Sequence, residues 1–173
     1  MGASILSPYC QRSIPARSFF APWQLCGFAL KILVTLDGSE LAERALAHAV
    51  ALAKEFHSEI NLLRVPVVEA QAAVAYGMGV PYEPDLKHTQ SEAESYLYSW
   101  QMRLLGNGVA VRTEVVSGVP ADVILDVAEV DKADLIIMST HGRSGLNRLV
   151  YGSVAESVLR SSRIPVLLIP DKE

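Results

Sequence analysis

The chain has 173 residues and a mass of 18.8 kDa, which is enough for one domain with a substantial hydrophobic core. Half of its residues are hydrophobic and its formal net charge is −4, so the composition excludes wholesale disorder and a general nucleic-acid coat. The two cysteines, Cys10 and Cys26, are too few for a disulfide scaffold or a thiolate zinc site. We therefore expect neither metal chemistry nor thiol redox chemistry, and no nucleic-acid partner.

The first thirty residues differ from the rest of the chain. They contain both cysteines and no Asp or Glu, and they show no sustained helical or strand period. A secretory signal is disfavoured because Pro22, Gln24 and Gly27 interrupt the apolar run, which is also too short to cross a bilayer. We expect residues 1–30 to be a disordered extension without function. An organelle transit segment and sequence upstream of a later start are the alternatives, and residues 31–173 are expected to form the domain.

The first predicted elements are a strand, a helix and a second strand. Residues 31–36 form an aliphatic run that ends at the turn sequence Asp37-Gly38-Ser39, which predicts a buried strand followed by a helix N-cap. From Ser39 to about Phe56, apolar residues recur at spacings of three and four, as on one face of a helix. Ile60 to Val65 is a second predicted strand, and Pro66 closes it.

The second half of the chain continues this alternation. Helices are predicted over Asp85–Leu105, from Pro120 onward and over Ser153–Ser161; strands are predicted over Val109–Val116, Asp134–Ser139 and Ile164–Ile169. Five strands alternating with four helices imply right-handed crossovers and an α/β fold, an open parallel sheet with helices on both faces. Ligands of such Rossmann-like sheets bind at the carboxyl ends of the strands, where the strand order reverses.

The connection from Pro66 to Pro84 is long for a compact domain. It follows the second predicted strand, so it lies beside the expected ligand site. The sequence predicts a lid at this position, and an insertion without function is the alternative.

The segment Met138–Val154 is the richest in candidate chemistry. Gly142 allows backbone N–H groups to approach a ligand closely, and Gly152 precedes the last predicted helix. The N-terminus of that helix favours an anion, because its N–H groups and dipole attract negative charge. Ser153 with Glu156 has the form of a capping box, which predicts that the Ser153 hydroxyl caps the helix when no ligand is bound. The alternative is that the glycines only shape an ordinary loop.

Four other polar residues near these strand ends are candidates for ligand contact. Asp37 can accept a hydrogen bond from a ribose hydroxyl, or it can form a turn before Gly38. His141 is expected to shape the loop or stack on a ligand, since no nucleophile with an orienting acid accompanies it. Arg143 and Arg148 are secondary candidates for phosphate charge, and exposed loop arginines are the alternative.

Three blocks in this order resemble the universal stress protein (UspA-like) family. They are Ile32–Glu40, the glycine-rich segment and Ile164–Leu168, and the resemblance covers nearly all of residues 31–170. Nucleotide-binding members of the family carry the pattern G-x2-G-x9-G-[ST] after the fourth strand. Gly142, nine residues and then Gly152-Ser153 match that pattern, while Ser139 stands at its first glycine.

The resemblance implies an adenine nucleotide alpha hydrolase-like fold and a cytoplasmic homodimer that acts in stress responses. The dimer would form through the last strand and bind ATP or a related adenine nucleotide, with or without Mg²⁺, together with an unidentified protein partner and no membrane. The implied adenosine contacts are Thr35, Asp37, Val65 and Met138, and the implied phosphate contacts are Gly142, Gly152, Ser153 and Val154. A slow nucleotide hydrolase using His141 and Asp37, and a nucleotide-free interaction module, are the alternatives.

Overall fold

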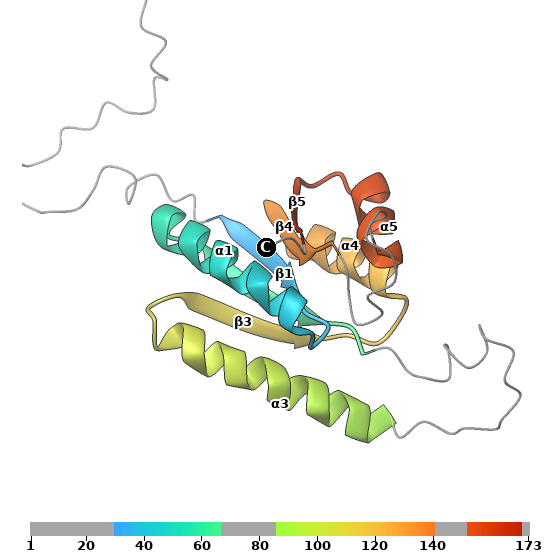
Figure 1. Cartoon of the computed structure of the whole chain (residues 1–173), viewed down its shortest axis with the longest axis horizontal. Helices are drawn as coiled ribbons and strands as arrows, with labels where there is room; N and C mark the ends of the chain where they lie inside the picture. The colour runs from blue at the N-terminus through green and yellow to red at the C-terminus, as the bar shows by residue number, and fades with distance from the viewer. Residues whose placement is uncertain (1–29, 67–85, 141–151, 171–173) are drawn as a thin grey trace, which may run out of the picture.

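A computed structural model describes residues 30–66, 86–140 and 152–170. Five strands form one sheet in the order β3-β2-β1-β4-β5, and every pairing between neighbours is parallel (Figure 1). The strands are β1 (Lys31–Thr35), β2 (Glu59–Arg64), β3 (Ala110–Val115), β4 (Leu135–Ser139) and β5 (Val166–Ile169). The predicted α/β fold is confirmed, and the strand order reverses between β1 and β4.

Four described helices cover the sheet. They are α1 (Glu40–Phe56), α3 (Leu86–Leu105), α4 (Pro120–Val130) and α5 (Ser153–Ser161). Helices α1 and α3 pack on one face, and α4 and α5 pack on the other (Figure 1). The predicted helix and strand bounds are confirmed to within two residues. The predicted N-terminal extension before Leu30 and the predicted lid from residue 67 onward lie outside the described residues.

Alternation along the strands builds one core layer on each face of the sheet. In β1, Ile32 and Val34 join the cluster under α1 and α3, whereas Leu33 joins the cluster under α4 and α5. All three side chains are at most 1% exposed, because both faces of the strand are covered. Burial on both faces is why the strand reads as a continuous aliphatic run rather than as an alternating one.

Small side chains bring α1 close to the sheet. Its buried face consists of Leu46 and four alanines, Ala42, Ala45, Ala49 and Ala53. The C-cap of the helix is His57, whose φ of 51° is left-handed, and the backbone N–H of His57 donates to the Ala53 carbonyl.

None of the described helices is long and apolar enough to span a membrane.

Candidate functional site

The carboxyl ends of β1 and β4 meet at the point where the strand order reverses. Val34 lies opposite Ile137 in the parallel register, so Thr35 and Met138 reach the same edge of the sheet. Open parallel sheets bind ligands at this switch point because the connections from the two neighbouring strands diverge to opposite faces there. Helix α1 follows β1 on one face, and α5 follows β4 on the other.

Asp37 forms a tight turn at the end of β1. Its Oδ1 accepts hydrogen bonds from the Ser39 backbone N–H at 2.9 Å and from the Ser39 hydroxyl at 2.6 Å. The Ser39 hydroxyl oxygen in turn accepts from the Ala42 N–H at 3.1 Å, so Ser39 is the N-cap of α1 as predicted. Gly38 between them has a φ of 85°, a left-handed conformation that glycine adopts without strain. The turn interpretation of Asp37 is confirmed, and its ligand contact stays a prediction.

Helix α5 begins one residue earlier than the capping-box pattern predicts. Its N-cap is Gly152, with no side-chain cap hydrogen bond, and Ser153 is the exposed first helical residue. The prediction that the Ser153 hydroxyl caps the helix is therefore wrong. The extended backbone of Gly152 makes this residue the N-cap, so the helix begins at Ser153, and the Glu156 carboxylate pairs with Arg160 at 2.8 Å instead of bonding back to the N-cap.

The start of α5 is fixed to the end of β4. The Gly152 N–H donates to the Thr140 carbonyl at 2.8 Å, and the Thr140 N–H donates to the Ile169 carbonyl of β5 at 3.0 Å. The Gly152 N–H is therefore already hydrogen-bonded within the protein. The next amides, those of Ser153, Val154 and Ala155, lie in the first turn of a helix, where backbone N–H groups have no intrahelical acceptor.

The two helix starts at the switch point differ in charge and in capping. The first turn of α1 carries Glu40 and Glu43 and follows the Asp37 turn, so it is acidic and capped by Ser39. The start of α5 has a glycine N-cap and no side-chain cap, with Glu156 engaged by Arg160. An anion is consequently favoured at α5 and disfavoured at α1.

Three of the predicted contact residues direct their side chains into the core. Met138 belongs to the buried cluster under α4 and α5, and Val65 and Val154 pack against that cluster. Met138 is buried and Val65 and Val154 are partly buried, so the backbone contacts expected of Val65 and Met138 stay predictions. Thr35 is half-buried at the end of β1, and Ser139 is 9% exposed at the end of β4.

The remaining predicted candidates are His141, Gly142, Arg143 and Arg148. They lie outside the described residues, so the structure places none of them. Two hollows on the described surface lie along α3 rather than between β1 and β4: one of about 500 Å³ against β3, and one of about 460 Å³ beside Arg64 and His88.

A polar cluster that the sequence analysis missed joins α1 to α3. Glu43 Oε1 accepts hydrogen bonds from the Tyr96 hydroxyl at 2.9 Å and from the Trp100 indole N–H at 3.3 Å. The Arg64 guanidinium lies 4.7 Å from the centre of the Tyr96 ring. Burial, reinforced by the hydrogen bond to Glu43 and its negative charge, raises the pKa of Tyr96 well above its ordinary value. The periodicity of α3 predicts an inward face, but not the glutamate 53 residues away that it meets.

Together these features define a doubly wound α/β domain with a ligand site expected at its switch point. The model of the universal stress protein family matches residues 30–170. Universal stress protein MJ0531 of Methanocaldococcus jannaschii is 37% identical over 145 residues, covering 83% of this chain and 84% of that protein. The chain belongs to the universal stress protein family.

Solved structures agree with this assignment. The structure of MJ0577, a protein of Methanocaldococcus jannaschii, superposes with a TM-score of 0.70 at 32% identity, covering 83% of this chain and 97% of that chain. A universal stress protein from Archaeoglobus fulgidus in complex with dAMP has a TM-score of 0.59 at 20% identity, covering 82% of this chain and 98% of that one. The latter similarity shows the shared fold.

Proposed function

We propose that this universal stress protein binds ATP or a related adenine nucleotide at the switch point between β1 and β4. The observation that carries the proposal is the contrast between the two helix starts. Helix α1 is capped by Ser39, whereas α5 begins at Gly152 without a side-chain cap and is fixed to Thr140 at the end of β4. The N–H groups of Ser153 and Val154 are then the phosphate donors.

Charge sets the direction in which the nucleotide lies. Asp37, Glu40 and Glu43 surround the start of α1, and a polyphosphate next to them would be repelled. A ribose is neutral, and its hydroxyls can donate to the Asp37 carboxylate. The phosphates therefore lie at α5, and the adenosine lies between the ends of β1 and β2, near Thr35, Asp37 and the backbone of Val65 and Met138.

The family match and one solved structure support an adenine nucleotide as the ligand. The chain belongs to the universal stress protein family, and the universal stress protein from Archaeoglobus fulgidus that shares its fold is in complex with dAMP. No group of three His, Cys, Asp or Glu among residues 30–66, 86–140 and 152–170 could hold a metal ion. Mg²⁺ in this proposal accompanies the phosphates of the nucleotide. Gly142 and the secondary candidates Ser139, His141, Arg143 and Arg148 stay predicted contributors to the phosphate end.

The variant Ser153→Pro tests the proposed phosphate donors directly. Proline is favoured at the first position of a helix, and Gly152 already has the extended backbone that a residue before proline requires, with φ −56° and ψ 148°. The substitution removes one N–H group and leaves α5 intact. Calorimetric titration with ATP should show affinity lower by roughly 10- to 100-fold, because a hydrogen bond to a charged group contributes about 1.5–3 kcal/mol.

Ser153→Ala is the matched control, since it removes the hydroxyl and keeps the amide. Its ATP affinity should stay close to that of the wild type, and both variants should keep the wild-type melting temperature without ligand. Equal affinities for wild type and Ser153→Pro would contradict the phosphate site. Absence of ATP, ADP and AMP binding by the wild type would instead favour the nucleotide-free interaction module.

In this proposal the protein is a cytoplasmic homodimer that acts as a stress-response regulator with an unidentified protein partner. The dimer forms through β5, which is one edge of the sheet and keeps Leu167 36% exposed. An unpaired apolar edge strand is an aggregation hazard, and pairing with a second copy covers it. As a regulator, the protein should turn over ATP near the uncatalysed rate, and a turnover assay with Mg²⁺ and ATP checks this.

A further inference from the structure

The opposite edge of the sheet, β3, carries features that the nucleotide site does not explain. The carbonyl of Val111 points away from β2, because it accepts a hydrogen bond from the Gln101 side chain at 3.0 Å, whereas the Val116 N–H donates to Arg64 at 3.2 Å. Backbone groups alternate direction along a strand. The backbone N–H and C=O groups of Thr113 and Val115 therefore point away from β2, as those of Val111 do. They face any further strand that joins the sheet at this edge.

The residues of β3 are complementary to a second copy of the same strand. The sequence Val111-Arg112-Thr113-Glu114-Val115 has opposite charges at equal distances from Thr113. When two such strands pair antiparallel around Thr113, Arg112 of each copy faces Glu114 of the other and Val111 faces Val115. An interface between identical subunits around a two-fold axis requires this kind of self-complementarity.

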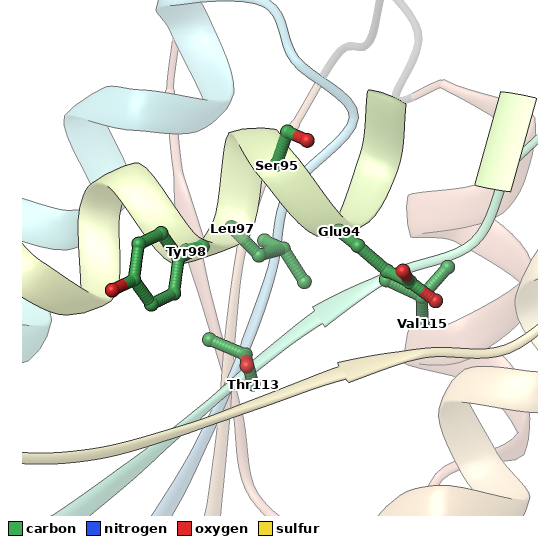
Figure 2. A pocket seen from close by; sticks show the side chains of 6 residues that line it. All are labelled: Glu94, Ser95, Leu97, Tyr98, Thr113 and Val115. Carbon is green, nitrogen blue, oxygen red and sulfur yellow. The ribbon is translucent and has the colours of Figure 1, made fainter. Parts of the chain in front are cut away.

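Helix α3, which lies beside β3, also carries surfaces that can fit a second copy: an exposed apolar patch and a hollow. Three large apolar side chains on one side of the helix are exposed: Tyr98 by 59%, Met102 by 52% and Leu105 by 46%. The Gln101 bond places this part of α3 beside Val111. A hollow of about 500 Å³ lies at the other half of the edge, between α3 and β3, and Thr113, Val115 and Leu97 are among its lining residues (Figure 2).

From these observations we infer that β3 pairs antiparallel with β3 of a second copy of the chain, around a two-fold axis at Thr113. In this arrangement Val111 of one copy lies opposite Val115 of the other. The exposed Met102 and Leu105 of one α3 then lie next to the hollow of the other copy and fill it. Apolar surface that the monomer leaves exposed is buried on both sides of the axis.

The contacts already made by β3 are compatible with this pairing. Arg112 bonds to Glu59 at 2.8 Å and to Asp131 at 3.5 Å, yet half of its side chain is exposed. Glu114 accepts a hydrogen bond from Asn61 at 3.3 Å through one oxygen, which leaves its second oxygen for Arg112 of the copy. Gln101 must release the Val111 carbonyl, which then accepts from a backbone N–H of the second strand.

This interface is independent of the dimer proposed at β5. The two edges lie on opposite sides of the sheet, separated by β2, β1 and β4. A chain that pairs at both edges forms a closed tetramer or a linear assembly, whereas loss of either interface leaves dimers. The nucleotide site contains no residue of β3, so ATP titrations report on the site and sedimentation reports on the edge.

Thr113→Pro tests the edge pairing without disturbing the β2–β3 ladder, because the N–H of Thr113 points away from β2. Analytical ultracentrifugation over a series of protein concentrations should show smaller assemblies for this variant than for the wild type. Thr113→Val is the matched control, since it keeps the N–H and a β-branched side chain, and it should sediment like the wild type. Identical sedimentation of wild type and Thr113→Pro would overturn the inference.

Charge reversal and cross-linking give two further readouts. Glu114→Arg places like charges opposite each other twice per interface and should weaken the assembly by roughly tenfold or more. Thr113→Cys, in a chain with Cys10→Ser and Cys26→Ser, should form a disulfide-linked dimer on mild oxidation, because opposed Cα atoms are about 5.5 Å apart in an antiparallel hydrogen-bonded pair. Glu129→Cys, at an exposed position of α4, is the control, and equal cross-linking of the two variants would also overturn the inference.

Discussion

At the scale of single residues, Glu43 couples two helices through one carboxylate oxygen. Tyr96 and Trp100 of α3 both donate to it, so the α1–α3 layer depends on a phenol that stays protonated. The folded state holds this proton more tightly than the unfolded chain, in which the pKa is near its ordinary value of 10.0. The stability from this shift is fully present below that pH and is lost as the pH rises above it.

Tyr96→Phe should therefore change how stability depends on pH. Below pH 10 the variant should be less stable by about 1 kcal/mol, because the hydrogen bond to Glu43 is lost. Above that pH the difference should narrow, since only the wild type has to keep the Tyr96 phenol protonated on folding. Urea unfolding of both proteins from neutral to alkaline pH measures this difference. A gap that widens with rising pH would contradict the role given to Tyr96.

Gly118 holds a backbone conformation that other residues cannot adopt without strain. Its φ is 154°, and a Cβ atom added there would lie 2.7 Å from the Val123 Cγ2 atom of α4. Gly118→Ala should lower the free energy of unfolding by about 1–3 kcal/mol through strain and the clash. Gly106→Ala is the control, because its added Cβ meets nothing closer than 3.5 Å, and it should change stability by less than about 0.5 kcal/mol.

At the scale of elements, the spacing between α1 and the sheet is set by small side chains. Ala49 is fully buried between the helix and the sheet, whereas Ala47 on the same helix is exposed. Ala49→Leu should destabilise the fold by about 1–3 kcal/mol, because the added atoms force α1 away from β1 and β4. Ala47→Leu adds the same volume on the solvent side. Thermal unfolding should place its melting temperature within a few degrees of the wild type, and a similar loss in both variants would count against close packing as the cause.

The elements themselves could be predicted well from the sequence, since local patterns determine them. A strand buried on both faces, such as β1, reads as an aliphatic run, and α1 shows the three-and-four spacing of a helix that packs on one face. The bounds of α5 were predicted correctly, but its cap was not, because Ser153 with Glu156 matches a capping box whereas Gly152 is the N-cap of the helix. The capping-box pattern alone does not give the backbone angles of the residue before it.

Contacts between distant elements could not be predicted in this way. The Glu43–Tyr96 bond joins residues 53 apart, and the Asn61–Asp131 bond joins residues 70 apart. Asp37 was predicted at the end of β1, but its two bonds to Ser39 emerge only when the turn is built. The candidate site is therefore predicted by position along the chain, whereas its polarity, acidic at α1 and uncapped at α5, follows from the three-dimensional arrangement.

At the scale of the whole molecule, both edges of the sheet bear on assembly, and the edge at β5 belongs to the proposed homodimer. Strand β5 has only four residues; Val166 and Leu168 are partly buried, Ile169 is buried and Leu167 is 36% exposed. Two-fold pairing of β5 would link the sheets of two copies into one. The melting temperature of such a dimer rises with protein concentration, because association stabilises the folded state by mass action.

Leu167→Lys should weaken that dependence. A lysine on an edge strand resists pairing because its charge is buried at the interface, and natural edge strands use lysine for this purpose. Val130→Lys is the control: Val130 is the last residue of α4 and 81% exposed, so it adds the same charge away from the edge. Sedimentation should show smaller assemblies only for Leu167→Lys. Its melting curves at several concentrations should keep only the concentration dependence that pairing at β3 gives. If both variants keep the behaviour of the wild type, β5 is not the interface, and the edge at β3 becomes the sole self-pairing surface to test.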